Sequence, residues 1–105
     1  MTDTCHVDTY VLDNLPPPHL MPDFINLDGL GYPEHLNATV ELVDRHVAEG
    51  RGERVALIGP DVSWTYVELA RMIDRMANVL VGKLGLVPGN RVLLRSANNP
   101  TLVAL

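Results

Sequence analysis

Ser63-Trp64-Thr65-Tyr66-Val67-Glu68-Leu69 marks the sharpest change of pattern in this sequence. Before it, residues 54–58 and 62–64 are rich in apolar side chains and predict two short strands joined by a turn. After it, apolar residues recur at helical spacing to about residue 84. The members of this stripe are Leu69, Met72, Ile73, Met76, Leu80 and Leu84. The stretch therefore predicts a β-hairpin followed directly by a long helix.

Thr65 and Glu68 have the spacing of a capping box at the start of that helix. In such a box the threonine hydroxyl accepts a hydrogen bond from the backbone N–H three residues on, and the glutamate carboxylate accepts one from the backbone N–H of the threonine. Because caps of this kind open many helices, we interpret both residues as structural.

A shorter helix is predicted upstream, over about residues 38–49. Asn37 is a favourable N-cap, and Gly50 is a natural stop because glycine adopts the left-handed conformation without strain. The apolar stripe consists of Val40, Val43 and Val47. On the opposite face Glu41, Arg45 and Glu49 are spaced for ion pairs worth roughly 0.2–0.5 kcal/mol each.

The last fifteen residues predict one strand and the start of one more helix. Residues 91–97 contain three successive apolar residues, which is typical of a strand buried on both faces. Asn98-Asn99-Pro100 then resembles a cap with proline in the first helical turn, leading into residues 101–105. A helix this short is not stable alone, and a single buried strand lacks a covering layer. We therefore expect a truncated domain, partnered by the rest of its polypeptide or by a second copy.

The first third of the chain has no apolar period. Residues 16–18 are three consecutive prolines, which exclude helix interior and central strand and favour polyproline II. Residues 20–33 read as an irregular loop. We therefore divide the chain into an extended, Pro-containing N-terminal arm, residues 1–36, and the start of an α/β domain, residues 37–105.

The formal net charge of −5 is unevenly distributed. Residues 1–49 carry nine acids and one base, whereas residues 50–105 carry four acids and seven bases. Neither half has a run of like charge, so we predict no nucleic-acid partner, which would need a concentrated basic face. We expect the acidic arm to lie against a more basic segment of its own chain or of a partner.

Few side chains suggest a reactive or metal-binding site. Cys5 is the single cysteine, which excludes an internal disulfide and fits a reducing, cytoplasmic location. The four histidines, at positions 6, 19, 35 and 46, have no partners at metal-ligand spacing, so we expect surface histidines. No apolar run approaches the roughly 20 residues of a membrane span, and no signal peptide is evident.

Six segments together carry a family resemblance: residues 14–18, 32–37, 41–47, 50–58, 64–69 and 86–100. Trp64 to Leu69 is similar to the first shared motif of the adenylate-forming enzymes. With the other segments, the chain from about Asn14 to Leu105 resembles the N-terminus of aryl-CoA ligases, in the benzoate-CoA and 2-aminobenzoate-CoA ligase branch. The resemblance implies the N-terminal piece of the large α/β domain of such an enzyme.

The resemblance also implies a two-step reaction. A carboxylate attacks ATP to give an acyl-adenylate and pyrophosphate, and the acyl group then passes to the thiol of CoA, with Mg²⁺ balancing the phosphates. The family's phosphate-binding Gly/Ser/Thr loop and C-terminal lysine have no match here, because Lys83, the only lysine, lies on an early helix. Thr65, Tyr66 and Glu68 match a motif that we interpret as structural. We therefore assign no catalytic, cofactor-binding or metal residues and expect the chain to be inactive on its own.

Two alternatives stay open. A stand-alone binding or interaction module could have kept this substructure and could pair through its exposed sheet. Another branch of the superfamily, such as a fatty-acid ligase, would keep the fold and change the acid. The expected substrate of the parent enzyme is a small aromatic carboxylate, benzoate or 2-aminobenzoate.

Overall fold

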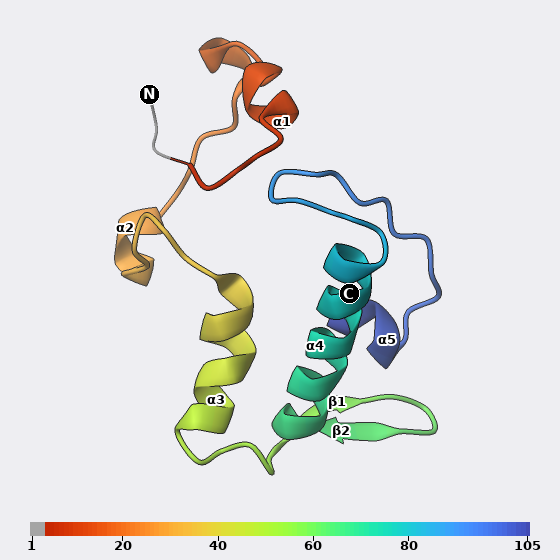
Figure 1. Cartoon of the computed structure of the whole chain (residues 1–105). Helices are drawn as coiled ribbons and strands as arrows, with labels where there is room; N and C mark the ends of the chain where they lie inside the picture. Colours follow the sequence, from red (N-terminus) through yellow and green to blue (C-terminus); the bar gives the residue numbers. More distant parts are fainter. Residues whose placement is uncertain (1–3) are drawn as a thin grey trace. The chain divides into compact units, whose positions relative to one another are not determined.

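A computed structural model describes residues 4–105 as helices and one small antiparallel sheet, a mixed α/β arrangement (Figure 1). The described chain divides into two compact units. One contains the residues up to Leu36 together with Val87–Arg91. The other contains Asn37–Leu86 and Val92–Leu105 and includes the sheet.

The second unit begins with a helical segment in which a π-helical turn, η2 (Val40–Asp44), is followed by α3 (Arg45–Ala48). The Asn37 side-chain oxygen accepts from the backbone N–H of Thr39 at 3.0 Å and of Val40 at 3.2 Å, so the expected N-cap is confirmed. Gly50 follows the helix with a φ of 77°, which confirms the expected left-handed stop.

The predicted hairpin is formed by β1 (Val55–Ile58) and β2 (Ser63–Thr65), which pair antiparallel. Leu57 lies opposite Trp64, and an irregularity in register separates this pair from the one at Val55. Gly59 closes the turn by donating its backbone N–H to the Val62 carbonyl at 2.7 Å.

Helix α4 (Tyr66–Gly82) starts immediately after β2. Glu68 N–H donates to Thr65 Oγ1 at 3.3 Å, and Thr65 N–H donates to Glu68 Oε2 at 2.8 Å, so both arms of the predicted capping box are present. The helix ends at Gly82, two residues before the expected end, and Leu84 is exposed beyond it. Gly85, with a φ of 65°, turns the chain after the helix.

The core of this unit is small. Its buried members are Val43, Leu69 and Ala104, one each from η2, α4 and α5 (Pro100–Ala104). Partly buried side chains packed against them come mainly from the sheet and α4 and include Leu57, Trp64, Tyr66, Met72 and Ile73. The predicted apolar face of α4 is thus the face that packs.

The prediction of a strand over residues 91–97 is wrong. Residues 91–97 form no strand in the structure, and Leu93 is 95% exposed. A strand needs a neighbour to receive its backbone hydrogen bonds, and within residues 4–105 the only paired strands are β1 and β2. The predicted helix start at Asn99 is confirmed, since its side-chain oxygen accepts from Leu102 N–H at 3.0 Å and Pro100 opens α5.

The N-terminal unit is less extended than the sequence suggested. It contains three short helical elements, α1 (Tyr10–Asp13), a 3₁₀ turn η1 (Pro18–Leu20) and α2 (Leu27–Leu30). Local polar contacts explain the first of them, because Asn14 Nδ2 donates to the Tyr10 carbonyl at 2.7 Å. Pro17, with φ −53° and ψ 150°, does have the expected polyproline II geometry. None of the described helices has the length and hydropathy to cross a bilayer.

We predict that Thr65→Ala lowers the free energy of unfolding by about 0.5–2 kcal/mol, because one arm of the capping box is lost. Denaturant unfolding of the parent protein measures the change. Glu53→Ala, which removes an exposed acid before β1, is the matched control and should leave stability nearly unchanged. A large fall in kcat with an unaltered Tm for Thr65→Ala would contradict the structural role.

Gly52→Ala should be destabilising by about 1–3 kcal/mol, because the added methyl would overpack against the first turn of α4. A Cβ at this buried position would lie 2.6 Å from Val67 Cγ2, and the branched valine has little freedom to move. Gly82→Ala is the control, since nothing lies within 4 Å of a Cβ there. Gly52→Ala should lower Tm, whereas Gly82→Ala should leave Tm unchanged or raise it. Equal losses of Tm in the two variants would refute the packing explanation.

Candidate functional site

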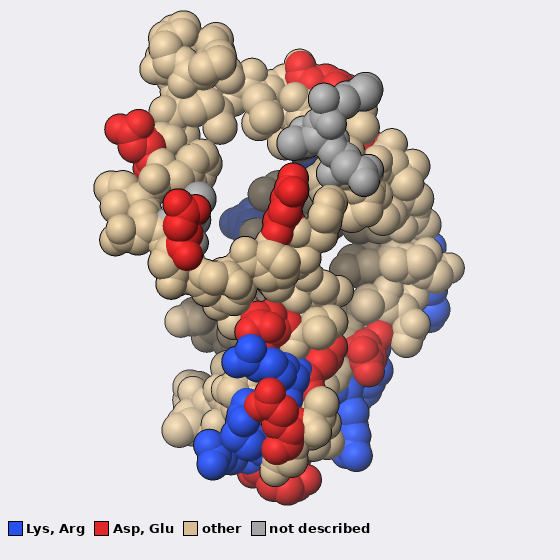
Figure 2. Space-filling model, turned by 90° about the vertical axis from the view of Figure 1, so that its left-hand side faces the viewer, with Lys and Arg blue, Asp and Glu red and all other residues tan. Residues whose placement is uncertain are grey.

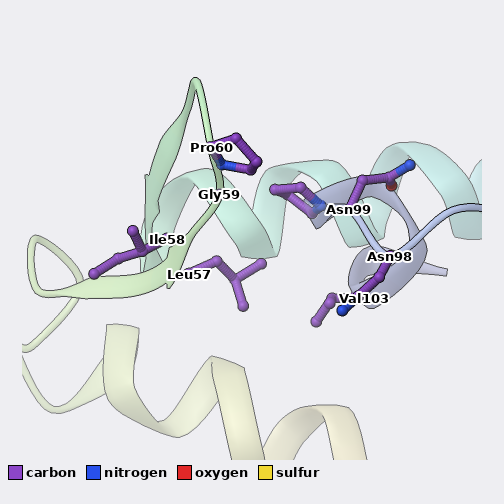
Figure 3. Close-up of a pocket in the computed structure, with 8 residues that line it drawn as sticks. Leu57, Ile58, Gly59, Pro60, Asn98, Asn99 and Val103 are labelled. Carbon is purple, nitrogen blue, oxygen red and sulfur yellow. The ribbon is translucent and has the colours of Figure 1, made fainter.

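A groove lies between the hairpin and α5 in the second unit, and we call it the hairpin–α5 groove (Figure 3). Its volume is about 280 Å³. The hairpin side and the helix side each contribute four residues: Leu57, Ile58, Gly59 and Pro60, and Asn98, Asn99, Pro100 and Val103. The lining is therefore mostly apolar, with two amide side chains at the start of the helix.

Part of the polar capacity of this groove is used inside the protein. Asn99 caps α5 through its side-chain oxygen and donates its Nδ2 to Ser96 Oγ at 3.4 Å. The Gly59 N–H is taken by the Val62 carbonyl. Because no ionisable residue lines the groove, these residues do not fit the phosphates of ATP or CoA or the carboxylate of an acid.

Thr65, Tyr66 and Glu68, the residues of the shared sequence motif, serve the strand-to-helix junction. Thr65 and Glu68 make the capping box described above. The Tyr66 ring stacks on the His46 imidazole with centroids 4.3 Å apart and planes 23° apart. The motif residues therefore position α4 against the helical segment that precedes the sheet.

His46 is more engaged than the sequence suggested. It is partly buried against Tyr66, and its Nδ1 accepts a hydrogen bond from Arg51 Nε at 3.1 Å. Arg51 also pairs with Glu49, so the guanidinium joins the histidine to the end of the helix. The expectation of a simple surface histidine is wrong, because ring stacking gives this side chain a packing role.

Charged side chains on the helical segment pair with each other. Arg45 pairs with Glu41, and its Nε lies 3.7 Å from a carboxylate oxygen of Glu49. These are the expected spacings of four along one helix face. In the lower part of Figure 2 basic and acidic side chains lie next to one another.

A second polar arrangement lies in the N-terminal unit and involves Asp8, Tyr10, Asn90 and Arg91, which we call the Asp8 cluster. Asp8 Oδ2 accepts from Asn90 Nδ2 at 3.0 Å and from Arg91 Nη1 at 3.3 Å. Asp8 Oδ1 accepts from the Tyr10 N–H at 3.0 Å. The Arg91 guanidinium also lies 4.4 Å from the centre of the Tyr10 ring.

The backbone reinforces this cluster. The N–H groups of Val7 and Asp8 both donate to the Pro88 carbonyl, at 2.9 and 3.0 Å. Gly89, with a φ of 94°, passes so close to the Asp8 backbone that a Cβ there would collide with the Asp8 carbonyl. The sequence predicted an acidic arm against a basic segment, and Asp8 with Arg91 is one such contact.

The Tyr10 backbone N–H, followed by the Asn90 amide and then Arg91, holds the pKa of the Asp8 carboxyl below its usual value of 3.8. The contacts that lower the pKa all favour the charged carboxylate. The side-chain hydrogen bonds of Asp8 therefore contribute most to the stability of the N-terminal unit while Asp8 is ionised, and nothing in the cluster resembles a catalytic acid poised near neutral pH.

In residues 4–105 no three His, Cys, Asp or Glu side chains come together as they would around a metal ion. Cys5 is a free, exposed thiol. The residues of the Asp8 cluster were not identified from the sequence, because Asp8 and Asn90 are 82 positions apart and share no periodic pattern.

In a comparison with known protein families, the family described as AMP-binding enzyme matches residues 43–105 of this chain. A 4-hydroxybenzoate–CoA/benzoate–CoA ligase of Rhodopseudomonas palustris is 45% identical over 58 residues, covering 55% of this chain and 11% of that protein. A benzoate–CoA ligase of Thauera aromatica is 40% identical over 62 residues, covering 59% and 12%.

Curated relatives with a different acid match equally well. An acetyl-coenzyme A synthetase of Burkholderia mallei is 44% identical over 64 residues, covering 56% of this chain and 10% of that protein. The alignments thus span about a tenth of the length of these relatives. No solved structure matches the chain significantly.

We predict that the Asp8 cluster opens in acid. Because the folded-state pKa is depressed, its contribution to stability is fully present above pH 3.8 and is lost as the pH falls through the lower folded-state pKa. Hydrogen exchange at the Val7 and Asp8 amides, followed against pH, measures the opening. Asp8→Asn should raise exchange at neutral pH and remove the acid-dependent step, whereas Asp23→Asn, an exposed acid outside the cluster, should change neither.

Proposed function

The chain belongs to the AMP-binding enzyme family, and from this premise we propose that it is the N-terminal part of an ATP-dependent acid–CoA ligase. The observation that carries the proposal is the family match over residues 43–105. The relatives named above are all ligases or synthetases that join an acid to CoA. What they share is therefore the reaction type, independently of the acid.

In the proposed reaction the parent enzyme activates a carboxylate with ATP and transfers the acyl group to CoA, using Mg²⁺. The chain described here supplies scaffold to that enzyme. Its motif residues cap and pack a helix, and the hairpin–α5 groove does not fit a phosphate group. We accordingly propose that the chain alone is inactive, and that the parent works in the cytoplasm, where ATP and CoA are available.

For the acid, we propose a small aromatic carboxylate, benzoate or 2-aminobenzoate. Two of the relatives named above are benzoate–CoA ligases, and the segments that suggested this branch include residues 14–18 and 86–100. The 44% identity with an acetyl-CoA synthetase makes acetate the competing substrate. An aromatic acid needs a flat apolar slot, which we place in the remainder of the parent enzyme.

A second function is favoured by one observation, the exposure of large apolar side chains in the second unit, including Ile58 and Leu93. Such side chains fit a small interaction module as well as a piece of a larger domain. The downstream reading frame separates the two, since a Gly/Ser/Thr-rich phosphate loop is required only by the ligase.

We expect the full-length parent to form the CoA thioester of benzoate or 2-aminobenzoate with a higher kcat/KM than that of acetate, octanoate or palmitate. A slot that fits one ring excludes octanoate and palmitate sterically. Acetate would enter the slot but would bind more weakly, by about 1–3 kcal/mol for each methylene-sized contact that it does not make. Thioester formation with each acid is the measurement. Preference for acetate or a fatty acid would overturn the aromatic assignment and keep the ligase, and thioester formation from none of them would overturn both.

A further inference from the structure

We propose that the hairpin–α5 groove is a docking surface for the polypeptide that continues after residue 105 in the parent enzyme. This inference rests on the proposed function, because it takes the chain to be the N-terminal part of a ligase. It assigns the groove an apolar segment of the same polypeptide as its occupant, and it excludes a substrate or cofactor from that place.

The lining decides the chemistry of the occupant. Leu57, Pro60 and Val103 offer carbon surface on the two sides of the groove (Figure 3). The Asn99 side chain and the Gly59 N–H already have partners inside the protein. An occupant that brought a charge would lose its hydration and meet no counter-charge, so an apolar side chain fits and a phosphate or carboxylate does not.

Two apolar side chains that line the groove are largely exposed to solvent. Ile58 is 85% exposed and Val103 is 54% exposed. Removing such side chains from water is favourable, so a partner that covers both would stabilise this unit. Large exposed apolar side chains beside a groove are typical of interaction surfaces.

The occupant that we propose is suggested by the length of the relatives, which greatly exceeds that of the aligned part. The alignments cover only 10–12% of each relative, so about nine tenths of such a protein lies outside the part compared here. The family match includes α5, which is one wall of the groove, so in the proposed parent enzyme a polypeptide that continues past residue 105 leaves from that wall.

A tethered segment also has an advantage over a second copy of the chain. A segment held on a short linker competes at an effective concentration of order millimolar, which a separate molecule does not reach at ordinary protein concentrations. The continuing polypeptide therefore competes for the groove more effectively than a second copy of the chain.

Cysteine labelling of the full-length parent tests this assignment. Ile58→Cys and Val103→Cys are placed singly in a parent whose native cysteines, including Cys5, are replaced by serine, and Glu53→Cys is the exposed control on the same unit. Each rate of maleimide labelling in the native protein is divided by the rate for the same variant in urea. We expect positions 58 and 103 to be protected at least about tenfold more than position 53.

Equal labelling at positions 58, 103 and 53 would overturn the proposal. Protection that disappears on about hundredfold dilution would identify a second copy instead, and protection that arises only when ATP and an acid are added would identify a substrate site. Hydroxyl-radical oxidation of Leu57 and Ile58 in the unsubstituted parent measures the same surface, so a variant that fails to fold does not decide the outcome.

Thioester formation by the unsubstituted parent keeps the two proposals apart. An active ligase with freely labelled positions 58 and 103 would overturn the docking surface alone. Protected positions in a parent that forms no CoA thioester would overturn the ligase function alone. A reading frame that stops after Leu105 would overturn both.

Discussion

The hydrogen-bonded junction between Thr65 and Glu68 is the constraint on which the second unit depends. It ends β2 and starts α4 within one residue, so the direction of the helix is set by the hairpin. Two further backbone bonds tie the first turn of α4 to the chain before β1, from Tyr66 N–H to the Arg54 carbonyl and from Val67 N–H to the Gly52 carbonyl, each 3.0 Å long. With its start held in this way, α4 places Leu69 in the core.

Elements with local signals were predictable from the sequence, and those that depend on distant partners were not. The caps at Asn37, Thr65 and Asn99 each need only a side chain and a backbone N–H two or three residues on, so sequence spacing suffices. Residues 91–97 have the composition of a strand but no neighbouring strand, and composition alone does not supply the missing ladder.

The Asp8 cluster and the hairpin–α5 groove also depend on residues that are far apart in sequence, so neither was predictable from local spacing. The Asp8 cluster joins Asp8 to the turn containing Asn90 and Arg91, and only the charge imbalance between the halves of the chain hinted at it. The hairpin–α5 groove joins residues 57–60 to residues 98–103, and its shape follows from how α5 packs beside the hairpin. The prediction of a surface His46 rests on the lack of metal-ligand partners, and it misses the stacking on Tyr66 because that ring is twenty positions away in sequence.

The scaffold role proposed above fits the different acids in the names of the relatives. Identity is 45% with a benzoate ligase and 44% with an acetyl-CoA synthetase, so similarity here does not separate one acid from another. The residues to which the structure assigns roles, such as Thr65, Glu68 and Gly52, cap and pack the junction between the hairpin and α4. A pocket that discriminates a ring from a methyl group needs side chains that contact the acid, and the observed contacts of these residues are with the helix and the core. Substrate choice is therefore expected to depend on residues of the parent enzyme outside this scaffold, and exchanging residues 37–105 between an aromatic-acid ligase and this parent should leave the preferred acid unchanged.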